Sequence, residues 1–517
     1  MLKINSNEIR LIKIPTFSDK RGNLSFLNTE KICGFLIKRV YYLYNLKKNQ
    51  ARGSHAHKNL KQCIICIKGK ATVYFNKGTK NEKKYFLDSP EKGLLIKSCS
   101  WCDIEKFEKD SILIVLASEE YNKKDYLRTK EKYQKYISKK KKIESVRYAT
   151  LERMHKDLEN LIIPALKSVI ESGHYILGKE VNKFEKNFAK FSNAKYALGC
   201  GNGFDALVLA LKSIDISRND EVIVPANSFV ATAMAVSSLG AKPIFADCDY
   251  NNFSIDLESV RDKITKKTKA IIPVSLYGIP LDVNKISLFA KKHNLKIIED
   301  ASQAHGVSFF SNKNQKLKKF SNWKVSTFSF YPTKNLGAIG DGGAIVTNDP
   351  KLYSKIKSLR NYGLNKLKSY EFIGMNSRLD EIQASILNIK LGYINAWTTK
   401  KRKIAKIYFQ ELKSIKSIKL IDQNLSEKSV LHVFPIKVLN NKRDSLIAFL
   451  KKNNIETNIH YLKSINNQQI YKQFNVKLNN CKKLEKELLS LPIDPYHLKN
   501  EILYVCSKIR EFFEKNE

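Results

Sequence analysis

The chain has 517 residues, of which 43% are hydrophobic and 10% aromatic. At about 100–200 residues per domain this length predicts two to four folding units, and the apolar content excludes a chain that is disordered throughout. The sequence has no run of about 18 uncharged apolar residues, and residues 1–10 lack the apolar core of a secretory signal. We therefore expect a cytoplasmic protein with no membrane partner. Nine cysteines spread over this length fit a reducing compartment better than a disulfide framework.

The charge is strongly positive, because 92 Lys and Arg against 50 Asp and Glu give a net charge of +42. The lysines are scattered through every segment, and residues 139–142 form a dense basic run. Neither a nucleic-acid recognition motif nor an interleaving of aromatic and basic residues accompanies this charge, so we expect no nucleic-acid partner. A positive field of this kind favours small anionic substrates.

Residues 1 to about 127 contain short segments rich in β-branched and aromatic residues, separated by turns. Short strands at regular spacing without helices predict a small all-β barrel or sandwich. The charged segment 129–148 has no clear apolar stripe and is predicted to be a basic linker, in part helical. The predicted strands are residues 38–44, 63–75, 84–87, 93–96 and 112–117.

From about residue 149 onward, apolar runs alternate with helical patterns. This alternation predicts an α/β unit with a mostly parallel sheet, covered on both faces, that binds its ligands at the carboxyl ends of the strands. A long helical stretch, residues 379–412, then leads into a smaller α/β lobe that ends near residue 514. The predicted strands are residues 221–224, 269–276, 296–299 and 325–329, and the predicted helices are residues 206–213, 284–293 and 352–359.

Three segments of the α/β unit carry candidate chemistry. Residues 326–343 (STFSFYPTKNLGAIGDGG) place Lys334 in a glycine-rich loop directly after a predicted strand, where a lysine can form a Schiff base. Residues 296–306 (KIIEDASQAHG) end a strand in two acids, and an acid there can face a cofactor. Residues 197–211 (ALGCGNGFDALVLAL) open a helix with a glycine-rich turn, whose free amides suit a phosphate. Each segment alone is often only structural, but together they predict a phosphorylated cofactor with a protonated ring nitrogen.

With these segments, residues from about 149 to 515 resemble the DegT-type sugar aminotransferases, which are pyridoxal-phosphate enzymes acting on nucleotide-linked keto sugars. The resemblance implies an α/β fold-type I aminotransferase with a large lobe of about 149–400 and a small lobe of about 401–517. It also implies a homodimer or higher homo-oligomer with active sites at the subunit interface. Further segments that carry the resemblance are residues 219–232 (NDEVIVPANSFVAT), 276–280 (LYGIP), 374–384 (GMNSRLDEIQA) and 460–461 (HY).

Carried over position by position, the resemblance makes Lys334 the lysine that binds pyridoxal 5'-phosphate and shuttles the proton. Asp300 then lies beside the pyridine nitrogen and keeps the ring protonated. Lys334 argues against the members of this fold that use a histidine there and run dehydrations. The triplet at residues 202–204 replaces the commoner Ser-Gly-Thr and resembles the Asn-Gly-Leu version of enzymes that aminate C3 of the sugar. The remaining implied roles are Gln303 at the ring hydroxyl, Phe229 on the ring face, the Gly203 and Phe204 amides with the Ser329 hydroxyl at the phosphate, and Asn376 at the phosphate of the neighbouring subunit.

In the amino-terminal region, residues 52–62 (RGSHAHKNLKQ) place two histidines two residues apart before a predicted strand. On an extended chain His55 and His57 project to the same face, so both imidazoles can line one pocket. Such a pair suits proton transfer at neutral pH, because imidazole titrates near that range. Histidines that serve only the packing of the barrel are the structural alternative.

A metal site is a further alternative for these residues. Metal-binding cupin barrels continue His-x-His with a glutamate and a third histidine, whereas this chain has Gln62 and Trp101-Cys102 there. Two neutral imidazoles hold an ion poorly. The two CxxC pairs could form a zinc knuckle, but residues 63–66 lie in a predicted strand, where an odd offset sends the two sulfurs to opposite faces. We therefore predict buried thiols and no metal.

Residues 1 to about 128 resemble the cupin-type (jelly-roll) sugar-nucleotide 3,4-ketoisomerases, through residues 52–58 (RGSHAHK) and 116–128 (LASEEYNKKDYLR). By that resemblance His57 moves a proton from C3 to C4 of the sugar, and His55 shuttles the hydroxyl proton. Arg52 and Tyr44 orient the substrate or stabilise the developing oxyanion. Tyr42 points to the same strand face as Tyr44 and competes with it for this role.

Together the two resemblances predict a bifunctional enzyme, with an isomerase domain at 1–128, a basic linker at 129–148 and an aminotransferase domain at 149–517. It would isomerise a dTDP-4-keto-6-deoxyhexose to the 3-keto sugar and aminate C3 with glutamate as donor. The product is a dTDP-3-amino-3,6-dideoxyhexose for surface glycans, with fucose-like and quinovose-like configurations both open. The alternative is an aminotransferase whose barrel only binds sugar.

Overall fold

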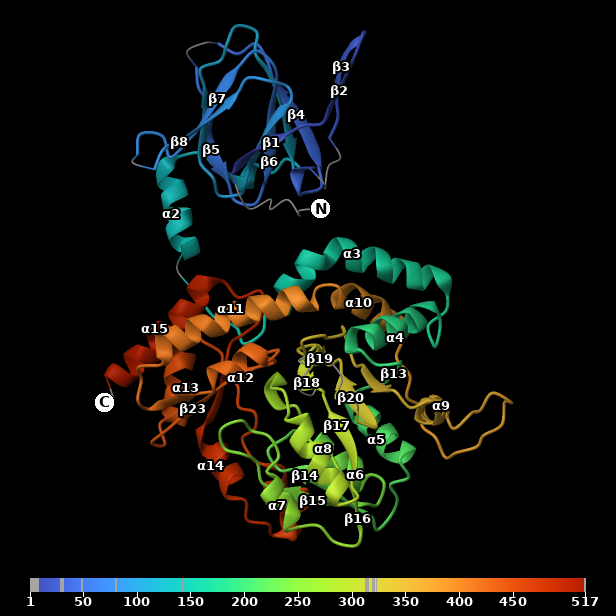
Figure 1. The fold of residues 1–517 in the computed structure, drawn as a ribbon. Helices are drawn as coiled ribbons and strands as arrows, with labels where there is room; N and C mark the ends of the chain where they lie inside the picture. The colour runs from blue at the N-terminus through green and yellow to red at the C-terminus, as the bar shows by residue number, and fades with distance from the viewer. Residues whose placement is uncertain are drawn as a thin grey trace. The chain divides into compact units, whose positions relative to one another are not determined.

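The computed structural model describes residues 9–27, 32–47, 50–79, 81–141, 143–311, 316–318, 321 and 323–515. The chain divides into two compact units, Met1–Ile143 and Glu144–Glu517 (Figure 1). Each unit has its own hydrophobic core. Within the described part of the chain, no helix is long and apolar enough to cross a membrane. Residues 1–8 and Lys142 of the basic run lie outside the described residues.

The first unit consists of two five-stranded antiparallel sheets, with strand orders β1-β9-β6-β11-β4 and β12-β5-β10-β7-β8. Apolar side chains from both sheets, such as Ile64 and Val73, form one core cluster between them. The prediction of an all-β barrel is confirmed. The strands are β1 (Arg10–Lys13), β4 (Arg39–Leu43), β5 (Arg52–His57), β6 (Gln62–Lys68), β7 (Ala71–Phe75), β8 (Lys83–Leu87), β9 (Lys92–Ile96), β10 (Cys102–Glu105), β11 (Ile112–Ala117) and β12 (Tyr126–Leu127), with a separate hairpin of β2 (Thr16–Asp19) and β3 (Gly22–Ser25).

The predicted strand 63–75 is in fact two strands, β6 and β7, which belong to different sheets. The chain turns between them at Gly69, whose φ of +75° is a conformation that glycine adopts without strain. The sequence pattern missed this turn because apolar residues continue on both sides of it.

A bulge in β5 decides which side chains share a face. Gly53 and Ser54 have positive φ, and in the register with β10 His55 pairs with Cys102 while Gly53 pairs with Asp103. Ser54 is therefore an extra residue, and the alternation of faces is reset. Arg52 returns to the face of His55, although an offset of three residues would place it on the other face. A Cβ atom on Gly53 would lie 2.8 Å from the carbonyl oxygen of Cys102, so the bulge requires glycine.

Most of the predicted linker is helical. α2 (Lys130–Lys141) follows β12 directly, and the Tyr133 hydroxyl donates to the Cys99 carbonyl at 3.2 Å. The Tyr133 ring also lies 5.6 Å from that of Trp101. The first part of this helix therefore packs on the barrel and belongs to the first unit.

The second unit is built on a seven-stranded sheet with the order β13-β21-β20-β17-β16-β14-β15. β21 runs antiparallel to its two neighbours, and the other neighbouring pairs are parallel, as the alternating pattern predicts. The strands are β13 (Tyr196–Cys200), β14 (Glu221–Pro225), β15 (Lys242–Ala246), β16 (Thr268–Ile271), β17 (Lys296–Asp300), β20 (Val325–Ser329) and β21 (Gly343–Thr347), with a hairpin of β18 (Phe309–Ser311) and β19 (Lys316–Lys318).

Helices pack on this sheet and on one another; in Figure 1, α3, α4 and α10 lie side by side. A three-stranded antiparallel sheet, β22-β23-β24, forms the smaller lobe with the last helices. The bounds are α3 (Leu151–Ser172), α4 (Lys179–Ser192), α5 (Gly203–Ser213), α6 (Ala231–Ser237), α7 (Leu257–Arg261), α8 (Val283–Lys292), α9 (Pro350–Leu359), α10 (Glu381–Leu391), α11 (Ile394–Leu412), α12 (Gln423–Lys428), α13 (Arg443–Lys452), α14 (Asn479–Glu487), α15 (Lys499–Glu514), β22 (Ile418–Leu420), β23 (Phe434–Val438) and β24 (Leu488–Leu491).

Two predicted elements have different bounds in the structure. β16 ends at Ile271, whereas the apolar pattern continued to residue 276. The long stretch 379–412 contains two helices, α10 and α11, separated at Gly392 and Tyr393. Because β14, β17 and β20 are parallel, their carboxyl ends meet at one edge of the sheet, and Asp300 and Ser329 are the last residues of two of them.

Candidate active sites

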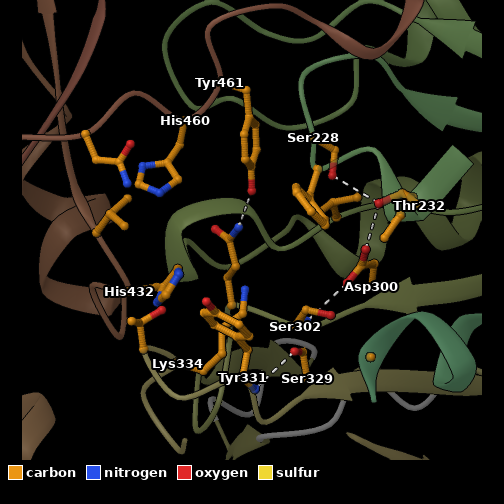
Figure 2. A pocket seen from close by; sticks show the side chains of 18 of the residues that line it. Ser228, Thr232, Asp300, Ser302, Ser329, Tyr331, Lys334, His432, His460 and Tyr461 are labelled. Atoms are coloured by element: carbon orange, nitrogen blue, oxygen red, sulfur yellow. Dashed lines mark hydrogen bonds between the residues drawn. The ribbon is translucent and has the colours of Figure 1, made fainter. Parts of the chain in front are cut away.

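A cavity of about 720 Å³ lies at this edge of the sheet (Figure 2). It brings together most of the side chains that the sequence singled out in the second unit. Those that line it are Gly203, Phe204, Phe229, Asp300, Gln303, Ser329 and Lys334.

Asp300 is buried and its carboxylate is held from two sides. Its Oδ2 accepts a hydrogen bond from the Thr232 hydroxyl at 2.8 Å, and its Oδ1 accepts from the Ser302 backbone N–H at 3.1 Å (Figure 2). Thr232 Oγ1 lies 3.1 Å from the Ser228 hydroxyl in turn. These bonds fix the orientation of the carboxylate at the cavity wall. Thr232 is the last residue of the motif at 219–232, and no role was predicted for it from the sequence.

Lys334 lies half-buried in the loop after β20, and its backbone N–H donates to the Tyr331 carbonyl at 2.8 Å. Burial lowers the pKa of its amine to about 8, against the opposing effect of the Asp300 charge. A large share of the amine is therefore neutral near pH 8, which is the form that acts as nucleophile or base.

Two further buried lysines hold the loop that carries Lys334. Lys401 Nζ donates to Asn335 Oδ1 at 2.9 Å, and Asn335 Nδ2 donates to the Val430 carbonyl at 2.7 Å. Lys390 Nζ donates to the Gly337 carbonyl at 2.8 Å. Burial lowers the pKa of both amines to about 8. The sequence pattern did not single out these lysines, because their contacts join helices to loops that are far away in the chain.

The amino end of α5 forms the part of the cavity that is suited to bind a phosphate. Asn202 caps the helix, because its Oδ1 accepts from the Asp205 N–H at 2.8 Å, and the first amides of the helix lie beside Ser329. A Cβ atom on Gly203 would lie 2.6 Å from the Cβ of Ser329. Glycine is therefore needed for the close approach of α5 to the end of β20. Asn202, the first residue of the triplet, therefore has a capping role, which a serine can also fill.

Gln303 is engaged at both ends of its amide. Its Oε1 accepts from the Tyr277 N–H at 2.6 Å, and its Nε2 donates to the Tyr461 hydroxyl at 3.0 Å. The Tyr461 ring lies 5.8 Å from that of Phe229, which is 56% exposed at the cavity. Burial raises the pKa of the Tyr461 hydroxyl, so this group stays protonated.

Two half-buried histidines, His432 and His460, also line the cavity, and neither was assigned a role from the sequence. His460 Nδ1 lies 2.9 Å from the Ser490 hydroxyl, and burial with the Lys334 charge lowers its pKa to about 4. Burial, followed by the charges of Lys334 and Lys401, lowers the pKa of His432 well below its usual value. Both rings are therefore neutral at physiological pH.

Asn376 does not line this cavity. It is exposed, and its Oδ1 accepts a hydrogen bond from the Arg378 guanidinium. Within one chain the structure thus separates Asn376 from the other expected cofactor residues, and its expected role concerns a neighbouring subunit.

In the first unit, the two histidines form a continuous chain of contacts with an aspartate. His55 Nδ1 lies 2.6 Å from the Gly53 carbonyl, and the Nε2 atoms of His55 and His57 lie 3.0 Å apart. His57 Nδ1 lies 3.1 Å from Asp125 Oδ2. The pKa of His57 is lowered to about 4 by burial and then by His55, against the effect of Asp125, and burial also lowers the pKa of His55.

Aromatic and basic side chains surround this pair. The Tyr126 ring lies 4.3 Å from that of His57 and 5.1 Å from that of His55, and the Arg128 guanidinium lies 4.4 Å from the Tyr126 centroid. Arg52 is exposed and, through the bulge, shares the face of the histidines. Asp125, Tyr126 and Arg128 all belong to the segment 116–128 that carries the resemblance, although the sequence analysis gave none of them a role.

Tyr44 does not join this group. It follows β4, is 56% exposed, and its ring lies 5.6 Å from that of Tyr42, which is 65% exposed. Tyr41 is on the opposite face of β4, where its hydroxyl accepts from Gln62 Nε2 at 3.1 Å. Strand alternation therefore sends Tyr41 into the barrel and Tyr44 out of it. Tyr41 was not singled out from the sequence.

The cysteines of the first CxxC pair are buried in different core clusters, Cys63 with Ile14 and Cys66 with Ile64. Their sulfurs thus point to opposite faces of β6. Among the residues that the structure describes, one group of three potential metal ligands is close together: Asp247, Cys248 and Cys481. The Asp247 carboxylate accepts the backbone N–H groups of both cysteines at 2.9 Å, which gives this group a structural role between β15 and α14.

Residues 156–510 match the DegT/DnrJ/EryC1/StrS aminotransferase family, and residues 7–138 match the family described as FdtA, WxcM-like, C-terminal. The chain belongs to the DegT/DnrJ/EryC1/StrS aminotransferase family. It carries an FdtA-type cupin domain in front of the aminotransferase domain. The aminotransferases of this family depend on pyridoxal 5'-phosphate.

Three relatives illustrate the match. The dTDP-3-amino-3,6-dideoxy-alpha-D-galactopyranose transaminase of Aneurinibacillus thermoaerophilus is 39% identical over 366 residues, which cover 71% of this chain and 99% of the relative. The structure of Streptomyces venezuelae DesV in complex with a ketimine intermediate has a TM-score of 0.67 at 34% identity, covering 72% of this chain and 99% of that one. NtdA of Bacillus subtilis, solved with its bound cofactor PMP, has a TM-score of 0.67 at 29% identity, covering 72% and 86%.

The residues of the cavity fit pyridoxal 5'-phosphate. The cavity is large enough for the cofactor and is lined by the half-buried amine of Lys334, whose pKa is lowered, and by Asp300, whose carboxylate is fixed by two donors. The start of α5 at Gly203 lies beside the Ser329 hydroxyl on the same cavity. A carboxylate suits a cationic ring nitrogen, and the amides of α5 suit a phosphate.

Proposed function

We propose that this chain is a bifunctional nucleotide-sugar enzyme. Its barrel isomerises a dTDP-4-keto-6-deoxyhexose to the 3-keto sugar, and its second unit aminates C3 with glutamate as donor. The product is a dTDP-3-amino-3,6-dideoxyhexose of the fucose or quinovose type. The single observation that carries this proposal is the His55–His57–Asp125 chain of contacts inside an FdtA-type domain that is fused to a sugar aminotransferase domain.

In the barrel, the proposed base is His57. Its Nε2 takes the proton from C3, the electrons of the C3–H bond form the double bond of an enediol, and the same proton is returned to C4. The hydroxyl proton moves from the oxygen on C3 to the oxygen on C4, with His55 as the shuttle. The lowered pKa values of both imidazoles support this role, because only a neutral ring can accept a proton. Arg52, on the same face, stabilises the oxyanion.

In the second unit, pyridoxal 5'-phosphate, when bound, supplies the carbonyl that carries the amino group and a ring that withdraws electrons. Lys334 provides a neutral amine that holds and moves a proton at Nζ. Asp300 holds the ring nitrogen, and the amides of Gly203 and Phe204 with the Ser329 hydroxyl hold the phosphate. Gln303, whose Nε2 already binds Tyr461, orients the ring hydroxyl.

Relatives support the proposed substrate. The names of the Aneurinibacillus thermoaerophilus and Streptomyces venezuelae relatives specify dTDP-linked sugars with the amino group at C3. We extend both features to this chain. We also propose a homodimer in which Asn376 reaches the partner's phosphate site, which its exposure outside the cavity supports.

The test of the isomerase role uses dTDP-4-keto-6-deoxyglucose, glutamate and pyridoxal 5'-phosphate with the wild type and His57→Asn. We expect the wild type to form the 3-amino sugar and the variant to form none. Supplying the 3-keto sugar nucleotide to His57→Asn restores the product, because the second unit is intact. Unchanged formation of the 3-amino product by His57→Asn from the 4-keto sugar would refute the isomerase role and favour a barrel that only binds sugar.

A further inference from the structure

The contacts of the histidine pair determine where its protons are. The Gly53 carbonyl can only accept a hydrogen bond, so the Nδ1 of His55, 2.6 Å away, carries a proton. An ionised Asp125 can likewise only accept, so the Nδ1 of His57 also carries one. In two neutral rings both Nε2 atoms are then left with lone pairs that face each other at 3.0 Å. The pair is therefore ready to take up one proton between its Nε2 atoms.

We propose that Asp125 is a positioning residue that holds His57 in the Nδ1–H tautomer, so that Nε2 is the base for the substrate. This inference rests on the proposed isomerase function and adds a residue to it. Once Nε2 has accepted the C3 proton, the Asp125 carboxylate also stabilises the imidazolium, and the His55 Nε2 shares its new proton.

The Asp125 carboxylate is held in one orientation, in which its two oxygens have different partners. Oδ2 faces His57, whereas Oδ1 accepts the backbone N–H of Asn59 at 2.9 Å. The backbone of Asp125 is fixed as well, because its N–H donates to the Asn122 carbonyl at 3.0 Å and its carbonyl accepts from the Lys58 N–H at 2.9 Å. The side chain is buried and cannot turn toward solvent.

This arrangement makes Asp125→Asn an informative substitution. The Asn59 N–H needs an acceptor, so the amide oxygen of the new asparagine takes that position and its NH₂ group faces His57 Nδ1. Nδ1 must then accept, the ring proton moves to Nε2, and the base is lost. Asp125→Ala removes both bonds but leaves His57 free to adopt either tautomer.

We therefore expect Asp125→Asn to be slower than Asp125→Ala, which is the reverse of the order expected for a residue with only a structural role. We expect Asp125→Ala to slow conversion of the keto sugar about 10- to 100-fold, as for other residues that orient a histidine. Asp125→Asn should slow it on the order of 10³- to 10⁴-fold, the size of a wrong-tautomer defect. A residue that only packs or bonds would give the smaller loss with asparagine, which keeps the size and both contacts.

The experiment follows dTDP-4-keto-6-deoxyglucose by ¹H NMR without an amino donor, so that only the barrel reaction is observed. ¹H–¹⁵N correlation spectra of the same proteins report the His57 tautomer, which should be Nδ1–H in the wild type and Nε2–H in Asp125→Asn. Asp88→Asn, an exposed aspartate bonded to Lys92 Nζ at 2.9 Å, serves as control and should stay within about twofold of the wild-type rate.

The inference is overturned if Asp125→Asn is as fast as Asp125→Ala or faster, or if His57 is an Nε2–H tautomer in the wild type. A wild type that leaves the keto sugar unchanged would instead refute the proposed function, and the ¹⁵N spectra would still decide the tautomer. Thermal melting and the dispersion of the ¹H–¹⁵N spectra show whether the barrel of each variant is folded.

Discussion

The two candidate sites of this chain differ in how their groups meet. In the barrel, the catalytic candidates contact one another: three contacts of 2.6–3.1 Å join the Gly53 carbonyl, His55, His57 and Asp125. In the second unit, Lys334 faces a cavity of about 720 Å³ from a loop and Asp300 faces it from the end of β17. The comparison teaches that a site proposed only to move protons can be complete in its own side chains, whereas a cofactor site arranges its side chains around a space.

We expect the largest effect from replacing Lys334, and this substitution should distinguish the two sites. Lys334→Ala removes the only nucleophilic amine proposed for the cofactor, so amination should fall at least about 10³-fold, while conversion of the 4-keto to the 3-keto sugar continues. Absorbance near roughly 410–430 nm after adding pyridoxal 5'-phosphate, as expected from the chemistry of this cofactor, should be seen in the wild type and lost in the variant. Loss of the isomerisation as well would contradict the independence of the two sites.

Gly53→Ala is the corresponding substitution for the barrel site. The new Cβ would lie 2.8 Å from the Cys102 carbonyl at a φ of +80°, so we expect the barrel to lose about 1–3 kcal/mol of stability. A shift of the bulge by 1 Å misplaces Arg52 and His55 and should slow isomerisation about 10²-fold. Thermal melting and the NMR assay measure the two effects. Wild-type isomerisation in a folded variant would show that the bulge does not set the site.

Thr232→Val tests the fixed carboxylate of the second site. The substitution removes the hydroxyl that donates to Asp300 at 2.8 Å while keeping the side-chain shape. A hydrogen bond to a charged group contributes about 1.5–3 kcal/mol, so kcat/KM for amination should fall on the order of 10- to 100-fold. Isomerisation should not change. A Thr232→Ser variant retains the hydroxyl and should recover most of the activity; failure of both variants alike would mean that packing matters and the bond does not.

Tyr41→Phe and Tyr44→Phe form a matched pair on one strand. The Tyr41 hydroxyl accepts from Gln62 inside the barrel, so its loss should slow isomerisation about 5- to 10-fold. Tyr44 is exposed on the other face, and its variant should stay within about twofold of the wild type. The opposite order would restore the role that the sequence resemblance gave to Tyr44.

Lys390→Met changes stability rather than the reacting groups, and we expect the smallest effect on activity. Burial lowers the pKa of this amine from 10.5 to about 8, so between those pH values the unfolded chain binds more protons than the folded one. The free energy of unfolding of the cofactor-free second unit should therefore rise with pH from about 8 to 10.5, by about 3 kcal/mol from this residue. Melting curves across this range should rise less steeply in the variant; equal slopes would contradict the lowered pKa.

Sequence reasoning singled out residues that line one cavity of the second unit, because each of the main ones lies at a strand end or a glycine turn. The strand that ends in Asp300 and the glycine-rich loop with Lys334 both have this signature, and the parallel topology brings them together. Thr232, Lys390 and Lys401 were missed, because their roles depend on contacts between helices and loops far apart in the sequence.

The barrel was harder to predict in detail. The face of Arg52 depends on one extra residue, Ser54, which no alternation pattern reveals. Asp125 is 68 residues from His57, and its contact arises because β12 pairs with β5. The motif DYLR within residues 116–128 was the available signal, and it contains Asp125, Tyr126 and Arg128.

The regiochemistry of the product tests the central claim most directly. The wild-type chain is incubated with dTDP-4-keto-6-deoxyglucose, glutamate and pyridoxal 5'-phosphate, and mass spectrometry with proton NMR identifies the carbon that bears the new amino group. Two cooperating sites predict nitrogen at C3 and a hydroxyl at C4. Nitrogen at C4, the position of the original ketone, would contradict the account, because it requires the aminotransferase alone.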